Sequence, residues 1–129
     1  MGRRAIGTFT AVLDPVHLDD EAVSLARVDK AIDGDLVGTG RAQMLTVGTP
    51  VEGSAGYVAI DVISGSLHGR RGTFVLQHSG ILDRGAGTAT VTVVPDSGTD
   101  ELVGLRGTFH IENLAGEHRY VFEYDIHPD

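Results

Sequence analysis

Two side chains that could move a proton lie inside apolar stretches of the sequence. Asp61 lies between Ile60 and Val62, and His78 shares one alternating face with Leu76. Burying an unpaired carboxylate is costly, and desolvation would raise its pKa toward the range of a general base. A histidine titrates near neutral pH and can act as an acid or as a base. Asp61 and His78 are therefore the candidate catalytic residues.

Each of the two candidates also has a structural interpretation. Asp61 could form a salt bridge with Arg41 or with another arginine across a sheet, or it could lie exposed on an outer face. His78 could be a core histidine that is bonded to a backbone carbonyl. The sequence leaves both interpretations open, and it does not decide whether the protein is an enzyme.

Other kinds of chemistry find little support in the sequence. Cysteine is absent, so there is no thiol nucleophile, disulfide or thiolate metal site. The six histidines show neither HxH nor HExxH spacing, and no metal site is expected. The glycine-rich stretches match neither a phosphate loop nor a dinucleotide-binding motif, and no serine lies in a GxSxG elbow. We expect no cofactor.

The charge of the chain argues against nucleic acid as a partner. The net charge is −8, with a single lysine and nine scattered arginines, whereas phosphate contacts need clustered cations. The first ten residues contain no apolar run long enough for a signal peptide or a membrane span. We expect no membrane association and a cytoplasmic protein.

The elements that must position Asp61 and His78 are β-strands. Apolar and polar residues alternate with a period of two along most of the chain, and 18 glycines provide turns between the alternating stretches. One stretch, 22–32, could instead form a short helix. The expected strands are Arg4–Leu13, Ala22–Ile32, Asp35–Thr46, Tyr57–Ser66, Gly72–Ser79, Thr88–Pro95, Gly107–Asn113 and His118–His127.

Eight consecutive strands predict an all-β, antiparallel up-and-down barrel, because closure removes the exposed strand edges. A two-sheet sandwich is the alternative. Residues 1–129 should form one barrel domain. Such a barrel is either filled by side chains or holds one small ligand. An alternating aromatic row lies on the last strand and consists of Tyr120, Phe122 and Tyr124. These side chains could pack the core, or they could form an aromatic wall for a ligand.

The connections carry recognisable turn signals. Asp14-Pro15 should end the first strand, and His17–Glu21 is an acidic loop. Asp33-Gly34 predicts a two-residue type I′ hairpin, and Gly80–Gly87 is expected to connect two further strands.

A repeated motif opens two of the expected strands. Leu67–Phe74 and Leu102–Phe109 both read LxGxRGTF, and Gly7-Thr8-Phe9 is a partial third copy. We expect Gly107, inside the second copy, to need a positive φ, so that Gly107→Val would destabilise the fold.

Three segments of the chain resemble the DUF3224 family of bacterial proteins. They are Gly34–Ala42, Gly72–His78 and Val94–Gly107, and the last is also similar to the Gly-Thr-rich turn of allene oxide cyclases and dirigent proteins. The resemblance implies an eight-stranded barrel similar to that of allene oxide cyclase, with a central cavity and assembly into a small homo-oligomer, a dimer or a trimer. It implies no reaction.

The resemblance also bears on the candidate site. Relatives with known chemistry guide the cyclisation or coupling of hydrophobic molecules without a metal or an organic cofactor. The family pattern places acidic residues where this chain has Gln43 and Asp61. A glutamine cannot move a proton at neutral pH, so a mechanism with paired carboxylates is in doubt.

Three functions follow as hypotheses. The first is a barrel that binds a small hydrophobic molecule in its lumen. The second is a cofactor-free isomerase or cyclase that uses the same lumen, and the third is a structural or interaction protein with a filled barrel. The residues expected to bind the ligand are Gln43, Tyr57, Asp61, Gln77, His78 and Val91.

Overall fold

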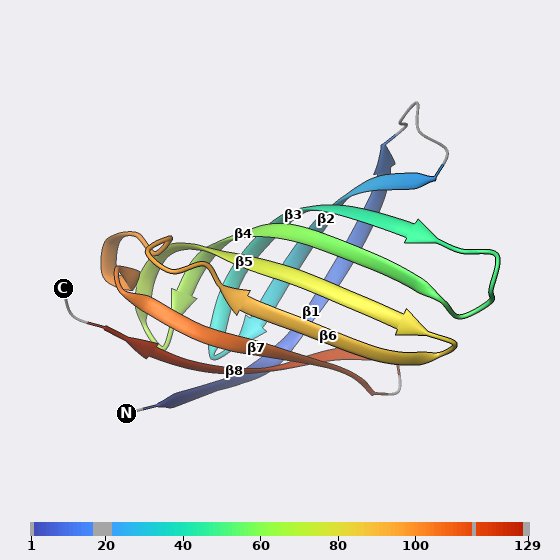
Figure 1. The fold of residues 1–129 in the computed structure, drawn as a ribbon. Helices are drawn as coiled ribbons and strands as arrows, with labels where there is room; N and C mark the ends of the chain where they lie inside the picture. Colours follow the sequence, from blue (N-terminus) through green and yellow to red (C-terminus); the bar gives the residue numbers. More distant parts are fainter. Residues whose placement is uncertain (1, 17–21, 115, 128–129) are drawn as a thin grey trace.

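The chain folds into a closed barrel of eight strands in which each strand pairs with its neighbours in sequence order (Figure 1). The computed structural model describes residues 2–16, 22–114 and 116–127, so the predicted acidic loop at 17–21 lies outside the described residues. All strand pairs are antiparallel, and β1 closes the barrel against β8, which confirms the predicted fold class. The strands are β1 (Arg3–Val16), β2 (Val23–Gly34), β3 (Leu36–Gly48), β4 (Ala55–Leu67), β5 (Arg70–Asp83), β6 (Ala86–Val93), β7 (Leu105–Leu114) and β8 (Glu117–Ile126).

Helix is almost absent from the described residues. A single 3₁₀ turn, η1 (Asp100–Leu102), lies in the crossing between β6 and β7. The stretch that could have been a short helix is β2, so the strand prediction for it is confirmed. No helix in the described ranges has the length and apolar character that a bilayer crossing requires.

The first strand continues past its predicted end. β1 runs to Val16, and Pro15 is paired with Ala26 of β2. On its other side β1 is paired with β8 as far as Phe9, and the described residues place no strand along the rest of that edge. A proline is tolerated at such a free edge because no partner there needs its missing N–H. The predicted stop at Asp14-Pro15 is therefore wrong.

The bend between β2 and β3 is not the predicted type I′ turn. That turn needs positive φ at both central residues, whereas only Gly34 has one, at 106°. The hydroxyl of Tyr120 fills the bend instead. It accepts a hydrogen bond from Leu36 N–H at 3.0 Å and lies 2.9 Å from the carbonyl oxygen of Asp33, to which it can donate.

Two-residue turns occur at the β4–β5 and β5–β6 hairpins. His68-Gly69 joins β4 to β5 and has φ values of 47° and 82°. Arg84-Gly85 joins β5 to β6 with φ values of 50° and 92°. Both pairs have the positive φ values that a type I′ turn requires. The predicted connection at Gly80–Gly87 is wrong, because the flanking strands extend to this short turn.

One end of the barrel, which we call the filled end, is packed with large side chains. It contains the β2–β3 and β4–β5 turns and the crossing from β6 to β7, whose Leu102 is fully buried. The predicted aromatic row of β8 points into this core, where Phe122 lies 5.8 Å from Phe74 and 5.2 Å from Phe109 between ring centroids. These rings are packing, because the three aromatic side chains of the row are at most 2% exposed.

The repeated motif places a glycine and then a phenylalanine on the inner face. A Cβ on Gly7 would lie 2.1 Å from Asp33 O, and one on Gly72 would lie 2.2 Å from Thr99 O. A Cβ on Gly107 would lie 2.4 Å from Glu123 O. Gly107 itself does not have a positive φ, so the expected cause of its importance is wrong. The motif glycine is needed because another backbone approaches it closely.

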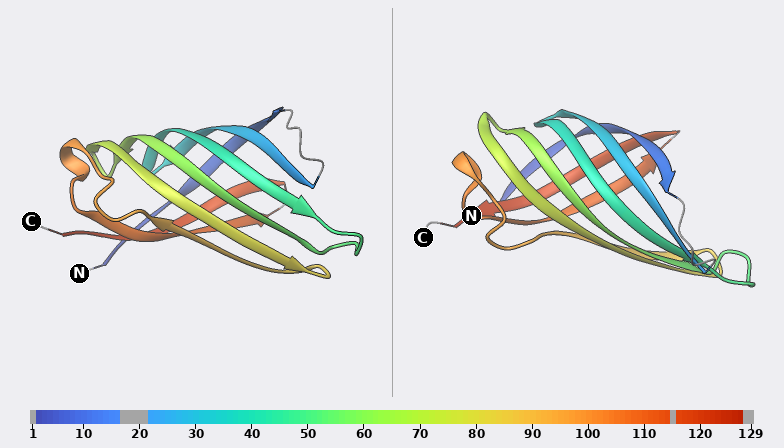
Figure 2. Two further views of the ribbon diagram at one scale, coloured as in Figure 1. Left: turned by 45° about the horizontal axis from the view of Figure 1, so that its top comes forward. Right: turned by 90° about the horizontal axis from the view of Figure 1, so that it is seen from above.

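The opposite end of the barrel, which we call the flared end, is open. In both views of Figure 2 the β5–β6 and β7–β8 hairpins diverge from one another toward this end. β6 and β7 are paired only at Thr92↔Thr108, and we call this boundary the open seam. Inward-facing side chains near this end are exposed, with Leu13 at 56% and Leu82 at 45%. The barrel is therefore filled at one end and hollow at the other.

Candidate ligand-binding site

A cluster of one lysine, one aspartate and one histidine lies inside the barrel above the filled end. Lys30 comes from β2, Asp61 from β4 and His78 from β5, and all three side chains face inward. Gly40 lies on β3, between β2 and β4, and is paired with Lys30. A Cβ on Gly40 would lie 3.0 Å from Oδ1 of Asp61. The lysine can reach the aspartate because this glycine has no side chain.

One oxygen of Asp61 holds the other two side chains together. Lys30 Nζ donates to Asp61 Oδ2 at 2.7 Å, and His78 Nε2 lies 3.2 Å from the same oxygen. The side chain of Asp61 is fully buried, while those of Lys30 and His78 are 12% and 7% exposed. The buried carboxylate is thus paired, as its burial requires. The proposed pairing of Asp61 with Arg41, or its exposure on the outer face, is wrong.

The pKa of Asp61 lies below its ordinary value of 3.8. Burial is the largest single influence and acts to raise the pKa. The hydrogen bond from His78 and the charge and hydrogen bond of Lys30 together outweigh burial. The expected rise of this pKa is therefore wrong. Asp61 is an ionised anchor at neutral pH, and it is a poor general base.

The ionised carboxylate determines how His78 can act. Because Asp61 Oδ2 is an acceptor, His78 must donate through Nε2–H, which assigns the proton of the neutral ring to that nitrogen. The described residues form no hydrogen bond to Nδ1. His78 can therefore present Nδ1 as an acceptor or a base, while Asp61 fixes the orientation of the ring.

A cavity of about 260 Å³ lies above the cluster, inside the flared end. Lys30 and His78 line it, whereas Asp61 lies behind them. The ammonium of Lys30 is also 5.3 Å from the ring centroid of Phe9, on which His118 is stacked at 5.0 Å. The other lining residues, mostly apolar, are Val28, Ala42, Met44, Tyr57, Ala59, Ile111 and Asn113. The lining draws on every strand except β6, so the cavity has its weakest wall beside the open seam.

The structure divides the expected ligand-binding residues between the two faces of the barrel. Asp61, His78, Tyr57 and Val91 face inward, and the ring of Tyr57 lies across Gly80, whose Cβ would be 2.1 Å from it. Gln43 and Gln77 point outward from β3 and β5 and are exposed. The structure therefore does not bring these two amides together with Asp61.

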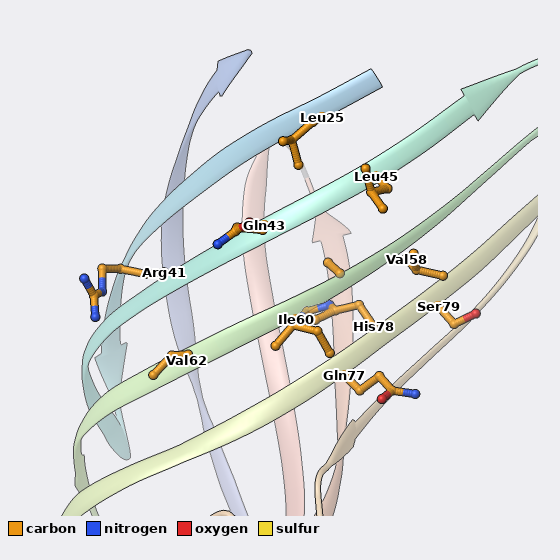
Figure 3. Close-up of a pocket in the computed structure, with 11 residues that line it drawn as sticks. Leu25, Arg41, Gln43, Leu45, Val58, Ile60, Val62, Gln77, His78 and Ser79 are labelled. Atoms are coloured by element: carbon orange, nitrogen blue, oxygen red, sulfur yellow. The ribbon is translucent and has the colours of Figure 1, made fainter. Parts of the chain in front are cut away.

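Gln43 and Gln77 belong to a different hollow, on the outer face of β2–β5, with a volume of about 700 Å³. Figure 3 shows their side chains beside Val58, Ile60 and Val62. This hollow is larger than the inner cavity, and His78 borders both, but its other polar lining residues, Arg41, Gln43, Gln77 and Ser79, include no carboxylate. Lys30 and Asp61 do not border it. We assign the chemistry to the inner cavity for that reason.

Lys30 is the functional candidate that the sequence analysis missed. It is the single lysine of the chain, and in β2 it alternates with Val28 and Ile32, both of which are buried. A lysine on an apolar strand face is unusual, because lysine is rarely buried unless it is paired. That pattern could have been used to predict an inward lysine with an acidic partner. In the described part of the chain, no three His, Asp or Glu side chains are arranged to hold a metal ion.

Comparison with known proteins adds a family to this geometry. Residues 6–124 match the model of the family described as "Protein of unknown function (DUF3224)". The chain belongs to the DUF3224 family. A crystal structure of a DUF3224 protein of unknown function from Shewanella oneidensis MR-1 is 37% identical and has a TM-score of 0.95. The match covers 99% of this chain and all of that chain. No curated protein matches this DUF3224 chain.

Proposed function

We propose that this protein binds a small, largely apolar molecule in the flared end of the barrel, and that Lys30 donates to an oxygen atom of that ligand beside His78. The observation that carries the proposal is the buried Lys30–Asp61–His78 cluster at the floor of an otherwise mostly apolar cavity. Apolar pockets with a few convergent polar groups are the usual form of a small-molecule site.

The charges of the cluster indicate the chemistry of that oxygen. Asp61 neutralises Lys30, but the ammonium has three N–H donors, and Asp61 Oδ2 is the acceptor of one. A carbonyl or carboxylate oxygen could accept another. The cavity volume of about 260 Å³ lies just below the usual ~300–1,000 Å³ for ligand pockets. The ligand should therefore be small.

A second candidate function is proton transfer on the same ligand, as in a cofactor-free isomerase or cyclase. His78 Nδ1 would take a proton from the carbon next to a carbonyl, Lys30 would stabilise the negative oxygen that forms, and His78 would return the proton to another carbon. His78 lines the cavity and its Nδ1 has no hydrogen bond among the described residues, which favours this candidate. This second proposal includes that the barrel of this protein is similar to that of allene oxide cyclase.

The filled-barrel alternative accounts for only one end of the molecule. At that end Leu36, Leu67 and Leu105 are completely buried, whereas the inner cavity lies at the other end. We further propose a cytoplasmic location and no nucleic-acid partner, in keeping with the net charge of −8.

Calorimetric titration with a set of size-matched molecules tests the binding proposal. The set should share one apolar body and end in a carboxylate, a ketone, an alcohol or a methyl group. We expect the carboxylate and the ketone to bind most tightly. Ala42→Leu, which adds volume to the cavity lining, should weaken binding at least tenfold. Gln43→Leu is the matched control, because the next residue on the same strand points outward.

Native mass spectrometry of the protein purified from its own host, with denaturing extraction alongside, complements the titration. A co-purifying small molecule would identify the chemical class of the ligand. Equal binding by the Ala42→Leu and Gln43→Leu variants, or a protein that binds no member of the set and carries no co-purifying molecule, would contradict the proposal.

A further inference from the structure

The free edge of β6 is unusually accessible for a strand in a barrel. Residues 86–90 are all exposed, and β7 is paired with β6 only at Thr92↔Thr108. The strand reads AGTATVTV and contains no charge and no proline. Its threonines and valines favour extended structure. In both views of Figure 2 no strand lies beside the free edge of β6 near the β5–β6 turn.

The hydrogen-bonding groups on this edge can be assigned from the neighbouring ladder. Val94 N–H donates to Val75 O of the β5 chain at 2.9 Å. Because the groups alternate along a strand, Thr88 and Thr90 also turn their N–H and C=O groups toward β5. Gly87 and Ala89 then turn theirs away from β5, toward the side where the described residues place no strand.

The other free edges at the flared end carry protective residues. The unpaired edge of β1 contains Asp14 and Pro15, and the unpaired edge of β7 contains Glu112. Charges and prolines of this kind are the usual means by which proteins prevent strand edges from pairing. The edge of β6 lacks both, which distinguishes it as a surface that can accept another strand.

We propose that the free edge of β6 pairs with β6 of a second copy of this protein, antiparallel across a twofold axis. Gly87 of one copy would face Ala89 of the other, and Thr88 would lie opposite its own copy. An antiparallel edge is self-complementary about a twofold axis. The chain carries a net charge of −8, so two copies repel each other over much of their surface. An uncharged edge is where they can approach.

Disulfide trapping tests the pairing directly, because the chain has no cysteine of its own. In the proposed register Thr88 and its copy form a non-hydrogen-bonded pair, whose Cα separation of about 4.5 Å suits a disulfide. Thr88→Cys should therefore form a covalent dimer on mild oxidation. Thr39→Cys is the matched control. Thr39 is also an exposed threonine, but its strand is paired on both sides, with Ala31 and Ser64.

Sedimentation of the unmodified protein, over a hundredfold range of concentration, provides the second measurement. We expect a species of twice the 13.6 kDa chain mass at the higher concentrations. Ala89→Pro removes an N–H on the free edge and leaves the β5–β6 hydrogen bonds intact, so it should yield a monomer with an unchanged circular dichroism spectrum. If Ala89→Pro does not fold, disulfide trapping with Thr88→Cys is the measurement that decides whether the two β6 edges pair.

A chain that stays monomeric at every concentration would overturn the proposal. So would a dimer that Thr88→Cys fails to trap more efficiently than Thr39→Cys. Neither result depends on whether the inner cavity binds a ligand.

Discussion

Lys30 and Asp61 lie on strands that are separated by β3, and their side chains meet at 2.7 Å above Gly40. Both groups are removed from most of the solvent, with 12% of the lysine side chain and none of the aspartate side chain exposed. The charge of each is tolerated because the other is present. This dependence leads to two predictions.

Removal of one partner should cost far more than removal of both. Lys30→Met leaves the buried carboxylate with His78 alone and should lower the free energy of unfolding by about 3–5 kcal/mol. The double variant Lys30→Met/Asp61→Asn should recover part of that loss. Urea denaturation of the two single variants and the double variant measures the coupling free energy. Arg4→Met is the control, because it removes an exposed ion pair with Glu123 and should cost about 0–1 kcal/mol. Additive effects at positions 30 and 61 would contradict the pairing.

Stability should fall with acidity in a way that depends on Asp61. Since folding lowers the pKa of this carboxyl below 3.8, the unfolded chain binds a proton over a range of pH in which the folded chain does not. The stabilisation is therefore complete above the unfolded pKa and is lost as the pH falls through the folded pKa. Denaturation from neutral pH to about pH 2 should show a shallower decline for Asp61→Asn than for the unmodified protein. Parallel declines would show that Asp61 does not contribute.

Gly107→Ala should destabilise the barrel even though the backbone at Gly107 is ordinary strand. The new Cβ would lie 2.4 Å from the carbonyl oxygen of Glu123 and 2.9 Å from the ring of Phe122. Overpacking of this kind costs about 1–3 kcal/mol, and Gly107→Val should cost more. Gly48→Ala is the control, because nothing lies within 4 Å of its Cβ position. Thermal denaturation should show a lower midpoint for the first variant only, and equal midpoints would refute the account.

Tyr120→Phe should weaken the filled end without changing its aromatic packing. The hydroxyl accepts from Leu36 N–H at 3.0 Å, and it lies close to two carbonyl oxygens to which it can donate. Without the hydroxyl the N–H of Leu36 stays buried and unpaired, at a cost of about 1–3 kcal/mol. Val75→Ala, on the outer face of β5, is a control for general sensitivity of the sheet. A variant as stable as the unmodified protein in urea would show that water replaces the phenol.

Much of the fold could be predicted from local pattern. The period-two alternation predicted all eight strands, and it correctly placed Phe74, Leu76 and His78 on one face. Alternation alone does not show which of the two faces is the inner one. Gln43 and Gln77 were expected in the lumen for that reason, although their strands present them to the outside.

The parts that could not be predicted depend on contacts between distant segments. The Asp33-Gly34 bend is wider than a two-residue turn because it is shaped around the hydroxyl of Tyr120, which is distant in the sequence. The partner of Asp61 depends on the register of three strands and on the missing side chain of Gly40. Neither contact leaves a signal in the residues that surround it in the sequence.

The pairing of β1 with β8 has a consequence for the way the protein is made. Arg3 lies opposite Tyr124, so the barrel joins the first and last parts of the described chain. During synthesis β1 leaves the ribosome with one edge unpaired, and it stays so until β8 has emerged. Closure of the barrel is therefore a late step, and it carries a high entropic cost because it joins distant parts of the chain. An arrested nascent chain that lacks β8 would expose the edges of β1 and β7, and such unpaired edges promote aggregation.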